Sequence, residues 1–118
     1  MVSVWETLKK GDIVNIPLSH SDLVDGKPRP ALVLYHDLVD RQLTVAYITS
    51  QTDNMEATDI LIPFGSPMCN IAGLPKTSVV KVHWLAIAKR IHVNFKYGEA
   101  DDELRRKVNK NLPECLAI

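Results

Sequence analysis

Hydrophobic residues in the first half of the chain occur in short runs, separated by polar segments that contain Gly and Pro. The runs are rich in β-branched and aromatic residues, which strands favour. The run ALVLY is almost entirely apolar, a pattern typical of a strand buried on both faces. We therefore predict four strands in this half, the last of them the weakest: Asp12–Leu18, Ala31–Tyr35, Leu43–Ser50 and Asp59–Pro63.

Two segments of the second half alternate between apolar and polar positions, as half-buried strands do. The segment Thr77–Trp84 places two valines and a tryptophan on one face, and Lys81 and His83 on the other. In Ile91–Tyr97 every second side chain is apolar and is predicted to point inward: Ile91, Val93, Phe95 and Tyr97.

The hydrophobic period changes near residue 100. Leu104, Val108 and Leu112 recur every four residues, which predicts an amphipathic helix with Asp101 as its N-cap. Pro113 is expected to kink or end this helix, because proline has no N–H and its ring clashes with the preceding turn.

Two connections contain Gly, Pro and polar residues and are predicted to be irregular: Ser19–Pro30 and Gly65–Pro75. Roughly five to seven short strands and one terminal helix indicate a mainly β fold, either a curved antiparallel sheet or a partly open barrel. At 118 residues the chain is expected to form a single domain, 1–118.

Composition narrows the classes of protein that fit. Apolar residues make up 46% of the chain and charged residues 24%, which excludes disorder along its whole length. With no run near the roughly 18 apolar residues of a membrane span and no secretory signal, we expect a cytoplasmic protein. His36 and His92 have no metal-ligand spacing with each other or with Cys69 and Cys115, so we predict no metal site. The two cysteines are predicted to be ordinary thiols.

The charges balance at 14 basic against 14 acidic residues, but they are unevenly distributed. Asp and Glu are absent from 60–98, a stretch that holds five basic residues: Lys76, Lys81, Lys89, Arg90 and Lys96. A cationic surface there would attract a phosphate backbone and bind it in a salt-dependent manner. The alternative is a solvated basic edge that discourages pairing between sheets. Neutrality of the whole chain therefore does not exclude an RNA partner.

Several segments, in order and spacing, resemble the MazF/PemK family of bacterial toxins: Gly11–Val14 (GDIV), Lys27–Val33 (KPRPALV), Val45–Gln51 (VAYITSQ) and Gly73–Val82 (GLPKTSVVKV). The resemblance covers about residues 10–112. It implies an SH3-like barrel of the PemK/MazF/CcdB type with a C-terminal helix, usually a homodimer. It further implies a metal- and cofactor-independent endoribonuclease that cuts single-stranded RNA, leaving a cyclic phosphate and a 5′-hydroxyl. A cognate antitoxin would block the site, and operator DNA would be contacted only through the antitoxin complex.

The resemblance also assigns site residues. Arg29 matches the arginine of the family's RP motif, and its planar guanidinium suits a phosphorane with developing charge. The alternative is a solvated loop arginine. Thr49 matches a hydroxyl residue at a strand end, where it would donate to the scissile phosphate, although Thr is also common in strands for its β-propensity. The predicted RNA-binding residues nearby are Lys27, Ser50, Gln51 and Lys76.

Lys81 and His83 mark a departure from the PemK branch, which has Arg and then Asp two positions apart. A cationic pair at these positions could still meet RNA, and His83 could transfer protons, since imidazole titrates near neutrality. His20 lies in the loop before Arg29, where some relatives also have a histidine, and is a second candidate for general acid or base. The alternative for each histidine is a residue with no catalytic role.

Two other functions remain open from the sequence. A gyrase poison of the related CcdB branch would share the fold, but that branch depends on a tryptophan near the C-terminus, and this chain ends Cys-Leu-Ala-Ile. A non-catalytic barrel that binds RNA or protein is kept open by the Lys81/His83 departure.

Overall fold

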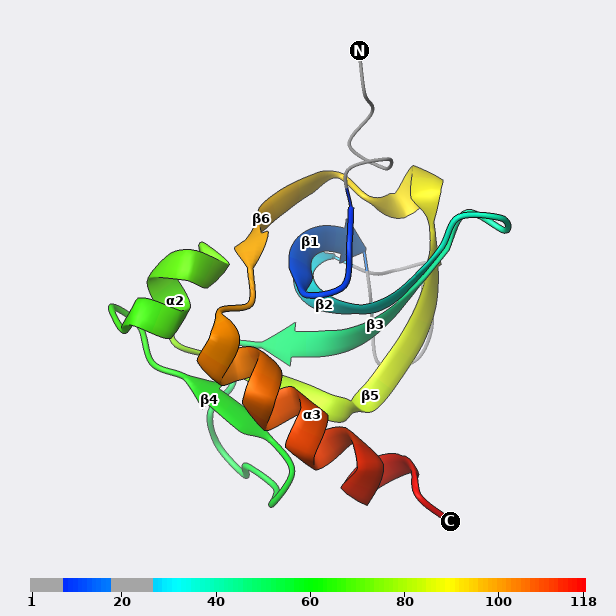
Figure 1. Ribbon diagram of the computed structural model, residues 1–118. Helices are drawn as coiled ribbons and strands as arrows, with labels where there is room; N and C mark the ends of the chain where they lie inside the picture. Colours follow the sequence, from blue (N-terminus) through cyan, green and yellow to red (C-terminus); the bar gives the residue numbers. More distant parts are fainter. Residues whose placement is uncertain (1–7, 18–26) are drawn as a thin grey trace.

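The computed structural model describes residues 8–17 and 27–118. Within them the chain forms strands, two α-helices and one 3₁₀ turn (Figure 1). In chain order these elements are β1 (Asp12–Pro17), β2 (Pro28–Asp37), β3 (Gln42–Thr49), β4 (Ile60–Ile62), α2 (Pro67–Ala72), β5 (Ser78–Lys89), η1 (Arg90–His92), β6 (Phe95–Glu99) and α3 (Asp102–Leu116).

The strands of the described ranges form one antiparallel sheet in the order β4-β5-β3-β2-β1-β6. Figure 1 shows this sheet curling around β1 and β2, so that β5 lies on one side of them and β6 on the other. The predicted mainly β fold, a curved antiparallel sheet of the half-barrel type with a C-terminal helix, is confirmed.

Each face of the curved sheet covers its own hydrophobic cluster. Leu32 of β2 belongs to the cluster beneath α2 and α3, whereas its neighbours Ala31 and Val33 belong to the cluster enclosed by the curl of the sheet. The centre of β2 is therefore buried on both faces, as its apolar run predicted. Truncating a fully buried leucine such as Leu32 to Ala typically costs about 2–5 kcal/mol, which indicates how strongly these clusters hold the barrel.

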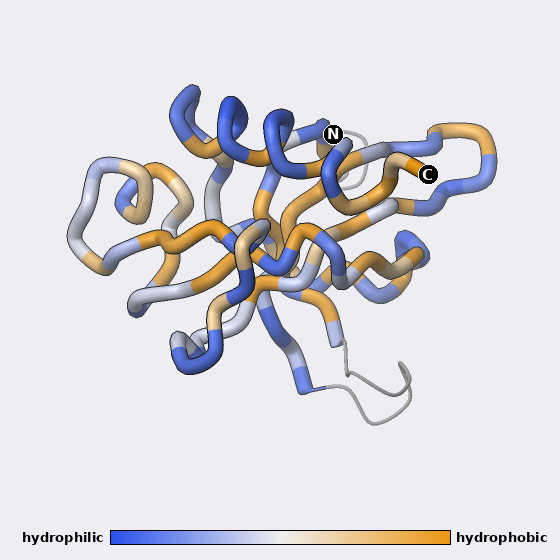
Figure 2. The backbone as a smooth tube through the Cα atoms, turned by 90° about the horizontal axis from the view of Figure 1, so that it is seen from below, coloured by the Kyte–Doolittle hydropathy of each residue, from blue (hydrophilic) through white to orange (hydrophobic). Residues whose placement is uncertain are grey.

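The C-terminal helix α3 begins as predicted. The Asp101 side chain accepts a hydrogen bond of 2.8 Å from the Leu104 N–H, and Leu104 and Val108 are buried. In Figure 2 the outer side of this helix is hydrophilic and its inner side hydrophobic. Pro113 does not end the helix, which continues to Leu116. Proline removes the helical bond to the Asn109 carbonyl, but Asn109 and Pro113 are both exposed, so water can bond to that carbonyl.

The prediction that Gly65–Pro75 is irregular was wrong, because this segment contains α2. Ser66 caps the helix by accepting the Cys69 N–H, Pro67 occupies the first turn, and Gly73 ends it with a φ of 73°. A capping Ser, a Pro at the first helical position and a Gly after the last one are the usual start and stop signals of a helix.

Three strand predictions also need correction. Ile91–Tyr97 is not one strand, since its first residues form η1 with Ile91 82% exposed, and β6 starts only at Phe95. Strand β2 begins at Pro28, within the predicted loop. Strand β5 continues to Lys89 and contains a bulge, because Ala46 pairs with Leu85 whereas Tyr47 pairs with Lys81.

In the part of the chain described, no helix is long and apolar enough to cross a membrane.

Candidate functional site

A cavity of about 320 Å³ lies where β2 begins and β3 ends. We call it the Arg29 cavity. It brings together five residues that were predicted for the site: Arg29, Thr49, Ser50, Gln51 and Lys76. Among the described residues, the rest of the lining consists of prolines, Ile48, Ser78 and Tyr97. Residues from four separate parts of the sequence thus converge on one concave surface rich in hydrogen-bond donors.

Arg29 is held by the backbone on both sides. It lies between Pro28 and Pro30, which restrict φ and keep the chain extended, and it pairs with Ile16 of β1. Burial raises the pKa of the Tyr47 phenol above its ordinary value, and the charge of the Arg29 guanidinium opposes part of this rise. Arg29 is therefore a half-buried cation whose backbone is anchored in β2 and whose side chain lines the cavity.

Thr49 is the last residue of β3, and its hydroxyl is oriented by the turn that follows. The Thr49 Oγ1 accepts a hydrogen bond of 3.1 Å from the Gln51 N–H. Because a hydroxyl has one proton and two acceptor positions, this bond leaves the proton available for an oxygen in the cavity. Ser50 and Gln51 follow as exposed residues on the same rim.

Sequence reasoning missed two polar residues of the cavity. Ser78 is buried and its Oγ donates to the Lys76 carbonyl at 2.9 Å, which fixes the turn that presents Lys76. Tyr97 reaches the cavity from β6, and its hydroxyl accepts a bond of 2.8 Å from Asn15 Nδ2. The Lys-x-Ser spacing just before β5 was the available signal for Ser78. Nothing local in the sequence indicated Tyr97.

The Lys81/His83 pair lies outside the Arg29 cavity. Lys81 is only 7% exposed, and its ammonium lies 2.6 Å from Oδ2 of Asp59, whose carboxylate is fully buried. His83 Nε2 lies 2.7 Å from Glu56 Oε2, and its Nδ1 lies 3.7 Å from Asp59 Oδ1. These two residues tie the segment before β4 to β5.

Two further residues were predicted for the site, Lys27 and His20. Lys27 is exposed directly before β2 and does not line the cavity. The His20 prediction lies outside the described residues.

The basic stretch 60–98 is partly neutralised by acidic residues from other parts of the chain. Besides the Lys81 pair, Lys96 Nζ lies 3.1 Å from Asp12 Oδ1, and the Asp12 side chain is fully buried. The absence of acids along the sequence therefore does not produce a continuous cationic surface. Lys76, at the rim of the Arg29 cavity, is exposed.

One group of potential metal ligands occurs in the described ranges, formed by Glu56, Asp59 and His83 with donor atoms within 4.8 Å of one another. The Lys81 ammonium already supplies a positive charge to this group through its ion pair with Asp59. The group also lines no part of the Arg29 cavity.

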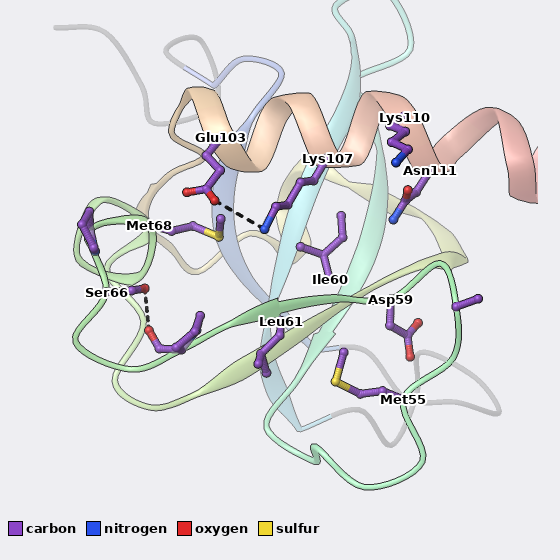
Figure 3. Close-up of a pocket in the computed structure, with 13 residues that line it drawn as sticks. Met55, Asp59, Ile60, Leu61, Ser66, Met68, Glu103, Lys107, Lys110 and Asn111 are labelled. Carbon is purple, nitrogen blue, oxygen red and sulfur yellow. Dashed lines mark hydrogen bonds and ion pairs between the residues drawn. The ribbon is translucent and has the colours of Figure 1, made fainter.

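A larger cavity of about 620 Å³ lies between β4 and α3 (Figure 3). Met55, Ile60, Leu61 and Met68 form its apolar part, and the Lys107–Glu103 ion pair of 3.4 Å crosses its rim. It offers no convergent set of phosphate-binding groups comparable to Arg29, Thr49 and Lys76. We therefore place the candidate chemistry in the smaller cavity.

A sequence profile of PemK-like, MazF-like toxins of type II toxin–antitoxin systems matches residues 9–116. The chain belongs to this family. No curated protein matches its sequence.

Solved structures of MazF-like proteins share the fold at low sequence identity. An endoribonuclease from a mycobacterial species, in complex with its cognate antitoxin, is 14% identical with a TM-score of 0.71, covering 95% of this chain and 97% of that one. Mycobacterium tuberculosis toxin MazF-mt6 is 19% identical with a TM-score of 0.69, covering 91% and 97%. MazF from Deinococcus radiodurans is 18% identical with a TM-score of 0.71, covering 94% and 97%.

Proposed function

We propose that this MazF-like toxin is a metal-independent endoribonuclease that cuts single-stranded RNA in the Arg29 cavity. The observation that carries the proposal is the convergence of Arg29, Thr49 and Lys76 in one cavity of a chain that belongs to a toxin family. The function of structural neighbours adds support, since two of them are endoribonucleases from mycobacterial species.

In the reaction, the ribose 2′-hydroxyl of one nucleotide attacks the adjacent phosphorus. A new bond forms between O2′ and phosphorus, and the bond between phosphorus and O5′ breaks. The 2′-hydroxyl proton leaves to a base and a proton is delivered to the departing O5′, so the products are a 2′,3′-cyclic phosphate and a 5′-hydroxyl. Negative charge builds up on the non-bridging oxygens in the transition state.

The residues of the Arg29 cavity have different roles in this reaction. The Arg29 guanidinium is permanently charged and can donate to two phosphate oxygens at once, so it stabilises the phosphorane. The Thr49 hydroxyl donates to a non-bridging oxygen, and Lys76, Ser50 and Gln51 hold the strand. His83 is engaged with Glu56, so of the two histidines we assign proton transfer to His20.

We further propose that the toxin acts in the cytoplasm as a homodimer and is inhibited by a cognate antitoxin, whose flexible segment covers the basic rim of the cavity. The solved complexes of an endoribonuclease with its antitoxin and of MazE with MazF support this partner. Contact with operator DNA would then occur only through the antitoxin complex.

The proposal is tested by incubating end-labelled single-stranded RNA with the purified protein in EDTA. The wild type should cleave, and Arg29→Ala should lower the single-turnover rate at least about 100-fold, the usual loss for one transition-state donor. Arg29→Lys keeps the charge without the planar fork and should also be strongly impaired. Arg106→Ala removes the same charge from an exposed position of α3 and should cleave normally.

Circular dichroism of each variant shows whether it is folded. Full activity of a folded Arg29→Ala protein would refute the assignment of the site. RNA that is bound but never cut by the wild type would identify a non-catalytic binding module instead.

A further inference from the structure

A third cavity, of about 360 Å³, is lined by Tyr47, His83, Trp84 and Leu85. We call it the aromatic cavity, because three of these four residues, the ones that line it within the described part of the chain, carry aromatic rings. Its volume is within the range of about 300–1,000 Å³ that small-ligand sites occupy. None of its described lining residues lines the Arg29 cavity, so the proposed cleavage of RNA does not explain why this cavity is present.

The bulge in β5 builds this cavity. Three residues of β5 bulge out between the pairs Ala46–Leu85 and Tyr47–Lys81, and His83 and Trp84 are two of the three. A bulge redirects side chains that would otherwise alternate regularly across the sheet, and bulges are common beside functional sites. Here it places two neighbouring aromatic side chains at one cavity.

The aromatic rings are held in fixed positions relative to one another. The ring centroids of Tyr47 and Trp84 are 6.1 Å apart at an interplanar angle of 89°, and those of His83 and Trp84 are 5.6 Å apart. The Lys81 ammonium lies 4.7 Å from the centroid of the Trp84 ring, and Glu56 holds His83. The cavity wall is thus preorganised, which reduces the entropy lost when a ligand binds.

Trp84 contributes little to the cores that hold the fold. It is half-buried, and among the described residues it belongs to neither of the two hydrophobic clusters. An aromatic side chain of this size at a cavity, outside the core, is typical of a binding surface.

The aromatic cavity adjoins the Arg29 cavity. Tyr47 precedes Thr49 by two residues on β3, so both side chains lie on the same face, about 7 Å apart along the strand. Arg29 lines one cavity and acts electrostatically on Tyr47 of the other. This separation is close to the distance that one nucleotide spans in an extended single strand.

We propose that the aromatic cavity binds the nucleobase of a nucleotide next to the scissile phosphate, and so contributes to the sequence selectivity of cleavage. The inference rests on the proposed function, because the scissile phosphate defines its position. Stacking on an aromatic ring attracts every base, and the preorganised walls of the cavity would discriminate between bases by their size and shape.

The test is a double-mutant cycle between Trp84 and individual RNA bases. Sequencing of the 5′-hydroxyl ends produced from a random single-stranded RNA pool first gives a sequence that the wild type cuts. That oligonucleotide is then made uncleavable with 2′-deoxyribose at the scissile nucleotide. Binding is measured for this parent and for versions with one abasic nucleotide on either side of the scissile phosphate.

For the wild type, one neighbouring abasic position should weaken binding about 5- to 150-fold, the effect expected for one stacked base. Trp84→Leu keeps an apolar side chain but loses the π face. It should bind the parent more weakly by a similar factor and should lose little further affinity at that abasic position. Trp84→Phe should restore most of the binding. Tyr35→Leu removes an aromatic side chain that is 53% exposed at the far end of β2 and should match the wild type.

Two outcomes separate the inference from the proposed function. If the wild type cuts RNA but Trp84→Leu binds like the wild type, or if each abasic position weakens both proteins equally, the base site is refuted while the nuclease assignment stands. If the wild type does not cut the pool, the proposed function fails first. Trp84→Leu must show the wild-type circular dichroism spectrum; if it does not, Trp84→Met replaces it as a second variant that keeps an apolar side chain without a π face.

Discussion

Removing one partner of the buried ion pair between Lys81 and Asp59 should be strongly destabilising, because it leaves an uncompensated buried charge. Lys81→Met removes the ammonium that lies 2.6 Å from Asp59 Oδ2 and keeps an apolar chain of similar length. Asp59 is then a fully buried carboxylate whose Oδ2 still accepts the Glu56 N–H at 2.8 Å, while Oδ1 has no hydrogen-bond donor. Removing one partner of a buried pair costs about 3–5 kcal/mol. Because one bond to Oδ2 survives, we expect about 3 kcal/mol.

Urea unfolding followed by circular dichroism measures this loss as a change in the free energy of unfolding at constant m value. In a domain of this length, about 3 kcal/mol corresponds to a fall in Tm of about 10–15 °C. The matched control is Lys107→Met, whose ammonium lies 3.4 Å from Glu103 with both side chains about half exposed. An exposed pair of this kind contributes at most about 0.5 kcal/mol.

A double-mutant cycle isolates the interaction itself. Asp59→Asn combined with Lys81→Met should cost less than the sum of the two single changes by at least about 1 kcal/mol, because each removes the same pair. The reasoning would be refuted if Lys81→Met were no more destabilising than Lys107→Met, or if the two changes were additive.

Three further predictions test other parts of the structure. Burial raises the pKa of the Tyr47 phenol above its ordinary 10.0, so the stability that this neutral group contributes is fully present below about pH 10 and is lost as the pH rises toward the folded-state pKa. Tyr47→Phe should therefore reduce the fall in unfolding free energy above pH 10. It should also remove the late step of the tyrosinate absorbance titration. Gly73→Ala places a Cβ 2.2 Å from the Tyr97 carbonyl oxygen at a φ of 73°. The change should lower the free energy of unfolding by about 2 kcal/mol or more in urea, and an unchanged value would contradict this close approach. Lys76→Met should lower the slope of log binding constant against log salt concentration by about one phosphate contact, while Lys81→Met should leave this slope unchanged. Equal slopes for the two variants would contradict the distinction between the two lysines.

Local signals in the sequence predicted the terminal helix well. The capping Asp101 and the period of Leu104 and Val108 act within a few residues, so the pattern and the structure agree. The segment around α2 contained equally local signals in Ser66 and Gly73, but its Gly and Pro content was interpreted as an irregular connection. Punctuating residues mark both loops and helix ends, and their order is what distinguishes the two.

The convergence of Arg29, Thr49 and Lys76 could be expected only from the family resemblance. These residues are separated by 20 and 27 positions, and their meeting depends on strand register, which hydrophobic pattern alone does not fix. Tyr97 joins them for the same long-range reason, which is why no motif indicated it.

The placement of Lys81 and His83 could not be derived from alternation. Alternation put both on one face, as for a regular strand, but the bulge in β5 begins directly after Lys81. Their acidic partners, Glu56 and Asp59, lie more than 20 residues earlier in the chain. Ion pairs of that sequence separation are a property of the folded chain, so the basic stretch looked more cationic in the sequence than it is.

The central claim, that the Arg29 cavity cuts RNA through the 2′-hydroxyl, is tested most directly by mass analysis of the products. A single-stranded RNA that the wild type cleaves in EDTA should yield a 2′,3′-cyclic phosphate and a 5′-hydroxyl. The same oligonucleotide with 2′-deoxyribose at the scissile nucleotide should remain intact, and folded Arg29→Ala should give the same ends at least about 100-fold more slowly. Products with a 3′-hydroxyl and a 5′-phosphate, or cleavage of the deoxy oligonucleotide, would contradict the account.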